Sequence, residues 1–557
     1  MKTMLRNAVN QALNLCYTEK LLLCGESPDF AIEEPDRADH GDFAVNVAML
    51  LARAEKKAPR QIAEKLVDKL NQLQPEFDLW QKVEIAGPGF INFFLNAQCW
   101  YRILDDVFAQ QDSFGRSTFG NGRKVQVEFV SANPTGPLHI GHGRGAATGD
   151  AVASVLQEAG FEVQREYYIN DAGNQMNTLG LSLYLRYCQL HGQQVDFPET
   201  CYQGDYIRDL AQEVINVDKD KYLQQSEEEA VAFFSKYGAE AIRAGIDDDL
   251  QRFGIHFDNW YSEQSLYDRD LVKAGIEKLQ LDGYTYEQDG AIWFRTTDFG
   301  DDKDRVLVRS NGVTTYFASD VAYHREKYER GFDTVIDVWG ADHHGYVPRM
   351  KAVLAALGRN PEDLQIILVQ LVNLLRGGEQ VMMSTRSGTF VTLKEVLDEV
   401  GSDACRFFFL MRRSDSKLDF DLDLAKKQST DNPVFYVQYA HARVCSISRN
   451  AQDAGICLPS SAAVKAELLQ LPEELALAKM LARYPEVIVS AASEYEPHRV
   501  TFYLQELAAK FHSYYNQHRV IVDDASTSEA RLYLVNAVKI VLHNALRVLG
   551  VSAPEQM

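Results

Sequence analysis

The chain has 557 residues, too many for one hydrophobic core, so about three or four domains are expected. Its composition, 46% hydrophobic and 24% charged, is that of a globular protein, and no apolar run reaches the roughly 18 residues of a membrane span. The eight cysteines form no C-x-x-C pair and the N-terminus lacks an apolar signal core, which predicts a cytoplasmic protein without structural zinc. At a net charge of −22, nucleic acid could bind only at local basic patches.

Residues 1–115 have the alternating pattern of a separate α+β domain. Helical apolar spacing covers 5–23 and 62–73, whereas 83–95 predicts two strands joined by a tight turn. A polar linker at 111–121 leads into the next domain.

The stretch 125–157 carries the strongest chemical signal. Residues 125–130 predict a strand, 131–137 are rich in turn residues, and a helix should follow, with His139 and His142 at its start. A helix N-terminus gathers N–H groups that favour phosphate, and Gly141 leaves room for a close approach. This pattern predicts a nucleoside triphosphate site, although glycine-rich strand–helix turns also occur in many other α/β proteins.

A second polar turn follows a predicted buried strand at 335–340. Asp342 would lie at the carboxyl end of a parallel strand, where it could accept ribose hydroxyls, with His343 beside it. Asp342, His343 and His344 could instead form a metal site. Neighbouring residues in a turn rarely converge on one ion, so no metal is predicted.

The remaining pattern predicts two further domains. Residues 122–395 should form a nucleotide-binding α/β domain, interrupted by a helical insertion near 175–280 that is rich in Gln, Glu, Asp and Leu. From 400 to 557 the chain has helical spacing, which predicts an all-α bundle. The fold class is therefore multidomain α/β.

Several motifs together resemble one family. His139-Ile-Gly-His142 matches the HIGH signature of class I aminoacyl-tRNA synthetases, and the longer run resembles bacterial arginyl-tRNA synthetases. Residues 41–46 and 83–95 resemble that family's N-terminal domain, which contacts the tRNA elbow, and Asp403-Ala-Cys-Arg406 resembles the phrase that opens its anticodon-binding bundle. The HIGH motif is formed by Ala132, Asn133, Pro134, Thr135, Gly136, Pro137, Leu138, His139, Ile140, Gly141 and His142.

This resemblance implies a Rossmann-type catalytic domain and a specific reaction. The family joins L-arginine to tRNA(Arg) through arginyl-adenylate, with ATP and Mg²⁺ as a substrate complex, and releases AMP and diphosphate. We expect a monomer that needs tRNA before it activates arginine. The alternatives are another class I specificity and a non-catalytic tRNA-binding paralogue. Cysteinyl enzymes would carry zinc ligands, glutamyl enzymes would want basic side chains at Asp320 and Glu287, and both signature histidines argue against a paralogue.

The resemblance also implies roles for individual residues. ATP would contact His139, Gly141, His142, Asp342 and His343. Tyr316 and Asp320 are four apart and would lie on one face of a helix, where the family holds the guanidinium, and Glu287 is a weaker second acid. Ser131 and Asn133 would take the α-amino group, supported by Glu128. Without the resemblance, Tyr316 and Asp320 would be interpreted as an ordinary surface pair.

Residues 381–388 depart from the general class I pattern, in a way that resembles other arginyl-tRNA synthetases. They occupy the place of the class I KMSKS loop, but Met382 and Thr385 stand where lysines would align, with Met383 and Ser384 between them. Arg386 is therefore our first candidate for the pyrophosphate contact, and Arg376 the second. On the bundle, Gln438, Tyr439 and Met557 are the candidates for tRNA binding.

Overall fold

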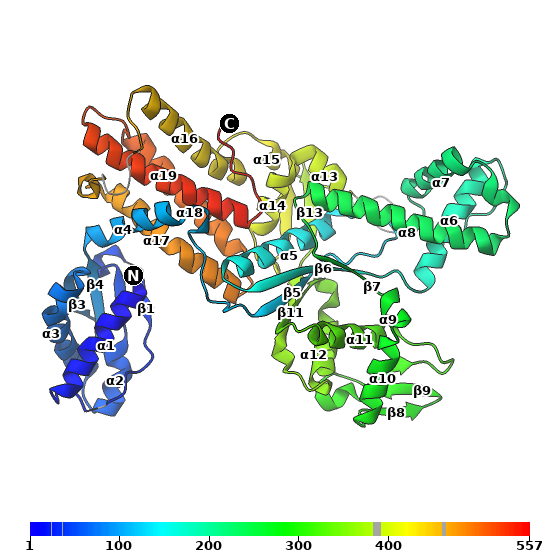
Figure 1. Cartoon of the computed structure of the whole chain (residues 1–557), viewed down its shortest axis with the longest axis horizontal. Coiled ribbons are helices and arrows are strands. Elements are labelled where there is room, and N and C mark those ends of the chain that lie inside the picture. Colours follow the sequence, from blue (N-terminus) through cyan, green and yellow to red (C-terminus); the bar gives the residue numbers. More distant parts are fainter. Residues whose placement is uncertain (24, 36, 382–390, 459–463) are drawn as a thin grey trace. The chain divides into compact units, whose positions relative to one another are not determined.

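The computed structural model describes residues 1–23, 25–35, 37–381, 391–458 and 464–557 (Figure 1). They form two compact units. The first comprises Met1–Ala109, Gly455–Ala482 and Arg519–Ala537, and the second comprises Gln110–Ala454, Arg483–His518 and Val538–Met557. The helical region after residue 400 thus contributes to both units, and the boundaries expected from the sequence stay predictions.

The first unit contains an antiparallel sheet in the order β1-β2-β4-β3. Its elements are α1 (Lys2–Thr18), β1 (Ile32–Glu33), β2 (Phe43–Val45), α2 (Val47–Glu55), α3 (Pro59–Phe77), β3 (Trp80–Ala86), β4 (Phe90–Leu95) and α4 (Ala97–Gln110). The tight turn predicted between β3 and β4 is present, and Gly87 and Gly89 both take positive φ in it. Because a Cβ on Gly89 would lie 2.8 Å from Pro59 Cβ, glycine is required there.

The first unit includes two segments from late in the chain, and helix α4 contacts one of them, Arg519–Ala537. The ring of Phe108 stacks on that of Tyr533, with centroids 4.0 Å apart. The Tyr533 hydroxyl also donates to Asp105 Oδ1 (3.0 Å). Tyr533 belongs to α19 (Ala525–Val548), so contacts distant in sequence build this part of the unit.

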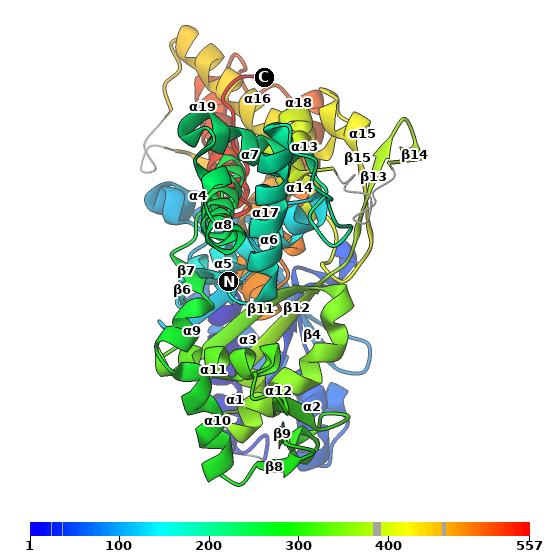
Figure 2. The same ribbon diagram turned by 90° about the vertical axis from the view of Figure 1, so that its right-hand side faces the viewer.

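The second unit is organised by a five-stranded parallel sheet in the order β12-β11-β5-β6-β7. The strands are β5 (Lys124–Glu128), β6 (Glu162–Ile169), β7 (Asn259–Ser262), β11 (Thr334–Gly340) and β12 (Leu364–Val369). The order runs from β5 through β6 to β7 on one side and through β11 to β12 on the other; β11 and β12 lie side by side in Figure 2. Ligands of such sheets bind where the order reverses, at the carboxyl ends of β5 and β11.

Helices cover both faces of this sheet. Successive side chains of β5 point to opposite faces, and those from Val125 to Glu128 are all buried. Phe129, just after β5, meets α5 (Ile140–Glu158), because a Cβ on Gly149 would lie 2.2 Å from its ring. Glu128 points to the opposite face, where Lys327 of α11 (Tyr316–Glu329) contacts it. The sheet therefore has α5 on one face and α11 on the other.

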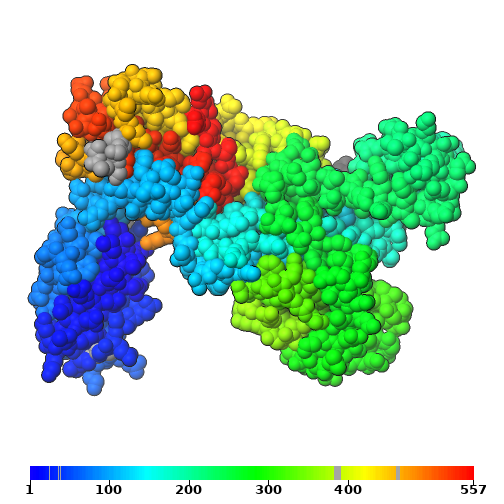
Figure 3. Space-filling model, viewed as in Figure 1, coloured from blue at the N-terminus to red at the C-terminus, as the bar shows by residue number. Residues whose placement is uncertain are grey.

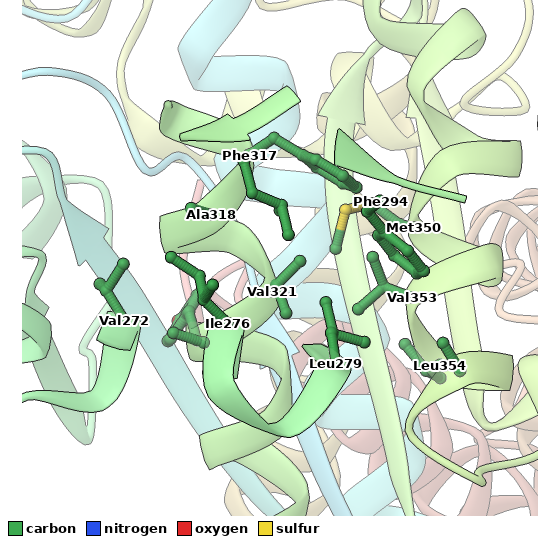
Figure 4. Close-up of a cluster of buried hydrophobic side chains, with 14 of the residues drawn as sticks. Val272, Ile276, Leu279, Phe294, Phe317, Ala318, Val321, Met350, Val353 and Leu354 are labelled. Carbon is green, nitrogen blue, oxygen red and sulfur yellow. The ribbon is translucent and has the colours of Figure 1, made fainter. Parts of the chain in front are cut away.

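A hydrophobic core fixes the position of α11 (Figure 4). Val321 of α11 packs with Ile276 of α10 (Leu271–Leu281) and Val353 of α12 (Val347–Ala356). Burying each such side chain contributes about 1.5–3 kcal/mol. Beside this core lies an antiparallel sheet of β8 (Thr285–Gln288), β9 (Ala291–Phe294) and β10 (Arg305–Val308), with α9 (Gln264–Asp268) nearby in the chain.

The helical insertion expected near 175–280 consists of α6 (Asn174–Leu190), α7 (Asp205–Asp218) and α8 (Glu227–Arg252). It forms the lobe at the right of Figure 3. After Arg252 the chain returns to the parallel sheet as β7.

Residues after 370 begin with a small sheet and continue as helices. The elements are β13 (Val372–Arg376), β14 (Glu379–Gln380), α13 (Leu393–Val400), α14 (Ser402–Leu410), β15 (Leu418–Asp421), α15 (Leu422–Lys426), α16 (Pro433–Asp453), α17 (Pro472–Ser493), α18 (His498–Gln517) and α19. Buried Arg406 of α14 donates to Asp150 of α5 and to the carbonyl of Leu549 (2.7 Å). Among the described helices, none is long and apolar enough to cross a membrane.

Candidate active site

The chain leaves β5 through a strained loop. Val130 and Ser131 both have positive φ, 68° and 41°, and such a conformation is rare for a β-branched valine. Ser131 Oγ donates to Glu128 Oε1 (2.9 Å) and accepts from the N–H of Tyr168 (3.1 Å). These bonds hold the loop at the switch point, and strain held in this way is typical of functional sites.

The HIGH loop ends in a cap built from its two histidines. His139 is the N-cap of α5, and its Nδ1 accepts from the N–H groups of Gly141 (3.1 Å) and His142 (3.4 Å). In return, His142 Nδ1 accepts from the His139 N–H (3.3 Å), and the rings stack with centroids 3.6 Å apart. Because each Nδ1 accepts a backbone proton, each ring carries its own proton on Nε2.

Burial makes both imidazoles neutral donors. It lowers the pKa of His139, and burial together with the neighbouring His139 lowers the pKa of His142 to about 3. Near neutral pH the rings therefore present N–H groups without a positive charge. Neutral donors at the positive end of a helix suit an anionic ligand such as a phosphate.

The HIGH loop is paired with the chain that follows the KMSKS-like segment. The Leu393 N–H donates to the Leu138 carbonyl (2.8 Å), and the Ile140 N–H donates to the Val391 carbonyl (3.3 Å). A Cβ on Gly143 would lie 2.7 Å from Leu393 Cδ1, so this glycine permits the close approach. The predicted KMSKS-like residues Met382, Met383, Ser384, Thr385 and Arg386 lie outside the described residues. Arg376, at the end of β13, forms an ion pair with Glu399 (2.6 Å).

Polar contacts fix the rest of the loop. The Tyr167 hydroxyl donates to the Ala132 carbonyl (2.8 Å), and the Tyr206 hydroxyl from α7 donates to the Thr135 carbonyl (2.6 Å). Asn133 Nδ2 donates to Gln175 Oε1 (2.8 Å) at the start of α6. The helical insertion therefore supports the loop directly.

Tyr316 and Asp320 both lie in the first turns of α11, as their spacing predicted. Tyr316 is exposed (55%), whereas Asp320 is half-buried and accepts from the Tyr346 hydroxyl. Burial raises the pKa of Asp320 above its ordinary value, even though the Tyr346 bond and His324 lower it. Because burial disfavours the charged form of Asp320, a cationic ligand bound beside it would stabilise that carboxylate.

The sequence reasoning missed a second acid, Glu263. It follows β7 directly, at the carboxyl edge of the sheet, and is almost fully buried. Burial first, and then the charges of Asp320 and Asp171, raise its pKa to about 7, although bonds from Ser319 and Tyr168 lower it. Its position after a strand of the parallel sheet was the available signal. Predicted Glu287 is instead exposed in β8, within the antiparallel sheet.

Asp342 follows β11 as expected, in the short 3₁₀ turn Ala341–Tyr346. Its side chain is 81% exposed, and that of His343 is 63% exposed, with His343 Nε2 3.5 Å from Asp342 Oδ2. Both are therefore open to a ligand at the switch point. Over the described ranges, no group of three or more His, Cys, Asp and Glu side chains could hold a metal.

Comparisons with known proteins agree along the whole chain. The model "tRNA synthetases class I (R), catalytic domain" matches residues 104–420, "Arginyl tRNA synthetase N terminal domain" matches 3–95, and "DALR anticodon binding domain" matches 437–557. Proteins named Arginine--tRNA ligase from Syntrophotalea carbinolica and Citrifermentans bemidjiense are 69% and 62% identical, with 100% of both chains covered in each case.

The chain belongs to the arginyl-tRNA synthetase family. A solved structure of the Thermus thermophilus arginyl-tRNA synthetase has a TM-score of 0.74 and 25% identity, with 100% of both chains covered. The predicted fold class is confirmed: a class I catalytic domain stands between an N-terminal domain and a helical anticodon-binding domain. Class I synthetases use ATP, and the residues that resemble their HIGH signature form the two-histidine cap of α5.

Three residues of the synthetase were predicted to bind tRNA, and the side chains of two of them are at least partly exposed. Buried Gln438 donates through Nε2 to Asp403 Oδ2 (2.8 Å) and the Ser552 carbonyl (3.0 Å), so its amide holds α16 to α14 and the C-terminal segment. Tyr439 is half-buried, with Arg443 4.5 Å from its ring centroid, and Met557 is 51% exposed. Aromatic and cationic groups of this kind suit unstacked bases.

Proposed function

We propose that this chain joins L-arginine to tRNA(Arg) with ATP, through arginyl-adenylate, and releases AMP and diphosphate. The observation that supports this most is a pair of acidic side chains at the carboxyl edge of the sheet, Glu263 directly after β7 and Asp320 in the first turns of α11. The two carboxyl groups are near enough for the charge of Asp320 to raise the pKa of Glu263, and burial raises the pKa of both, so a cation bound beside them would stabilise their charged forms. A guanidinium is a planar cation with several N–H donors, so it can satisfy both acids at once.

The HIGH cap would hold ATP for attack by the arginine carboxylate. As that carboxylate attacks the α-phosphate and pyrophosphate leaves, negative charge builds on the phosphate oxygens. His139 and His142 would donate their Nε2–H groups to these oxygens, with Gly141 leaving room for the nucleoside. Magnesium would enter with ATP as part of the substrate, and Asp342 would accept the ribose hydroxyls.

Arginine would lie between two sets of side chains. Asp320, Glu263 and the exposed ring of Tyr316 would surround the guanidinium. Ser131 and Asn133 would receive the α-amino group, with Glu128 supporting Ser131 through their 2.9 Å bond. We further propose that the enzyme works in the cytoplasm as a monomer, as the family implies.

Arginine-dependent exchange of pyrophosphate into ATP should require tRNA. The segment that replaces the KMSKS loop lacks its lysines, so bound RNA would be needed to organise it over the phosphates. The measurement is exchange with each of the twenty amino acids, with and without tRNA. Activity with another amino acid would indicate a different specificity, no activity in any mixture would indicate a non-catalytic paralogue, and strong exchange without tRNA would contradict the requirement.

Replacing Tyr439 with alanine should weaken tRNA binding while sparing ATP and arginine. Stacking of one base on an aromatic ring is worth about 1–3 kcal/mol, so a loss of roughly 5- to 150-fold is expected in a filter-binding titration. Tyr439→Phe is the matched control, because it keeps the ring but loses the hydroxyl that accepts from Arg443 (3.0 Å). If the alanine variant melts normally and binds tRNA like the wild type, Tyr439 does not contact the anticodon loop.

A further inference from the structure

A buried ion cluster lies directly beneath the switch point. Lys327 of α11 is fully buried, and its Nζ lies 2.6 Å from Glu128 Oε2 and 2.8 Å from Asp337 Oδ1. Glu128 ends β5, and Asp337 is its register partner on β11. The single ammonium group therefore joins the two strands between which the sheet order reverses.

The second oxygen of each carboxylate in this cluster links it to a residue that is proposed to bind arginine. Glu128 uses its other oxygen to accept from Ser131 Oγ (2.9 Å), in the strained loop after β5. Asp337 uses its other oxygen to bind His324 Nε2 (2.9 Å), and His324 Nδ1 lies 3.0 Å from the carbonyl oxygen of Asp320. Lys327 is thus linked to both ends of the expected amino acid.

The electrostatics of the cluster depend on this lysine. Burial raises the pKa of Glu128, although Lys327 opposes the shift. For Asp337, burial also acts upward, but Lys327 and His324 outweigh it and hold the pKa at about 2. The next carboxylate along the sheet, Glu166, has its own cation, because Arg330 lies 2.5 Å from one of its oxygens. Without Lys327, Glu128 and Asp337 would repel each other across neighbouring strands.

Such a cluster is a costly way to join two strands. Apolar side chains of similar volume often stabilise a protein as well as or better than a buried ion pair, so stability alone does not account for Lys327. Its value lies in orientation, since supporting hydrogen bonds hold binding groups in their productive geometry.

We propose that Lys327, paired with Asp337, is a positioning residue for arginine, which sets Ser131 through Glu128 and Asp320 through His324. This inference rests on the proposed function and adds a residue that would contact neither arginine nor ATP. It assigns to the Lys327–Asp337 pair a specific effect on arginine and none on ATP.

Two variants test the pair separately in the full-length enzyme with tRNA present. Lys327→Met removes the charge at similar length, and Asp337→Asn removes one charge at nearly constant shape. Each should raise KM for arginine about 10- to 100-fold, by analogy with residues that hold metal ligands in place, with KM for ATP nearly unchanged. Lys69→Met is the matched control, because Lys69 is also a buried lysine, paired with Glu19 (2.7 Å) in the first unit.

The outcomes separate positioning from stability. A purely structural role would lower the melting temperature of all three variants and leave KM for arginine at the wild-type value, which would overturn the proposal. Equal rises in both KM values would overturn it as well. If Lys327→Met does not fold, Asp337→Asn decides by the same criteria, with folding checked by thermal melting. A wild-type enzyme that binds no arginine would instead refute the proposed function.

Discussion

Replacing Asp320 with alanine should raise KM for arginine by at least about 100-fold, while KM for ATP stays close to the wild-type value. Asp320 is half-buried at the start of α11, and bound arginine would bury it further, so the substitution would leave the guanidinium without its carboxylate partner. Removing one member of such an ion pair costs about 3–5 kcal/mol, which corresponds to roughly 150- to 5,000-fold in affinity. Steady-state aminoacylation with arginine and ATP varied in turn measures both constants.

Three further variants make the Asp320 result specific. Asp320→Asn keeps an oxygen that can accept from the Tyr346 hydroxyl, so it removes the charge and preserves that contact. It should behave like the alanine variant if charge is what binds arginine. Glu263→Gln and Glu287→Gln then distinguish the two candidates for the second acid. An unaltered KM for arginine in Asp320→Ala would show that the guanidinium is held elsewhere.

The elements that local patterns specify could be predicted from the sequence. The alternating residues 125–130, the turn residues after them and the paired histidines predicted β5, its loop and α5. The four-residue spacing of Tyr316 and Asp320 likewise predicted one helical face, because both ends of that pattern lie within a single element. Motifs of this kind need no knowledge of distant contacts.

Long-range contacts determined what the sequence reasoning missed. Lys327 and Glu128 are 199 residues apart, and no periodicity indicates that this lysine, among 57 lysines and arginines, is fully buried. Glu263 was missed for a similar reason: it follows a strand of only four residues inside a region dominated by helices. Its burial becomes clear only once β7 is paired with β6.

Motif similarity also does not separate contact residues from supporting ones. Gln438 and Tyr439 are adjacent in the sequence and were both predicted to bind tRNA, yet the amide of Gln438 is bonded inside the protein and the ring of Tyr439 is half-buried beside Arg443. Adjacent helical residues point about 100° apart, so one can pack inward while the next faces a ligand.

Replacing His142 with alanine should slow arginine activation by roughly 10²–10³-fold, since removing one preorganised donor to developing charge costs about 2.7–4 kcal/mol. The measurement is tRNA-dependent pyrophosphate exchange at saturating arginine and ATP. Because burial holds the pKa of His142 at about 3, the ring is neutral throughout the ordinary assay range, and the wild-type rate should show no loss from its protonation until the pH falls toward that value.

The alanine substitution also removes the acceptor for the His139 N–H, so its effect must be separated from loss of the helix cap. His142→Gln is the control, because its side-chain amide offers both an oxygen to accept that proton and an N–H to donate. If the donated hydrogen bond carries the effect, His142→Gln should recover much of the rate, whereas a purely structural cap would show up as a lower melting temperature in His142→Ala. Near-normal exchange by a well-folded His142→Ala would rule out this histidine as a phosphate donor.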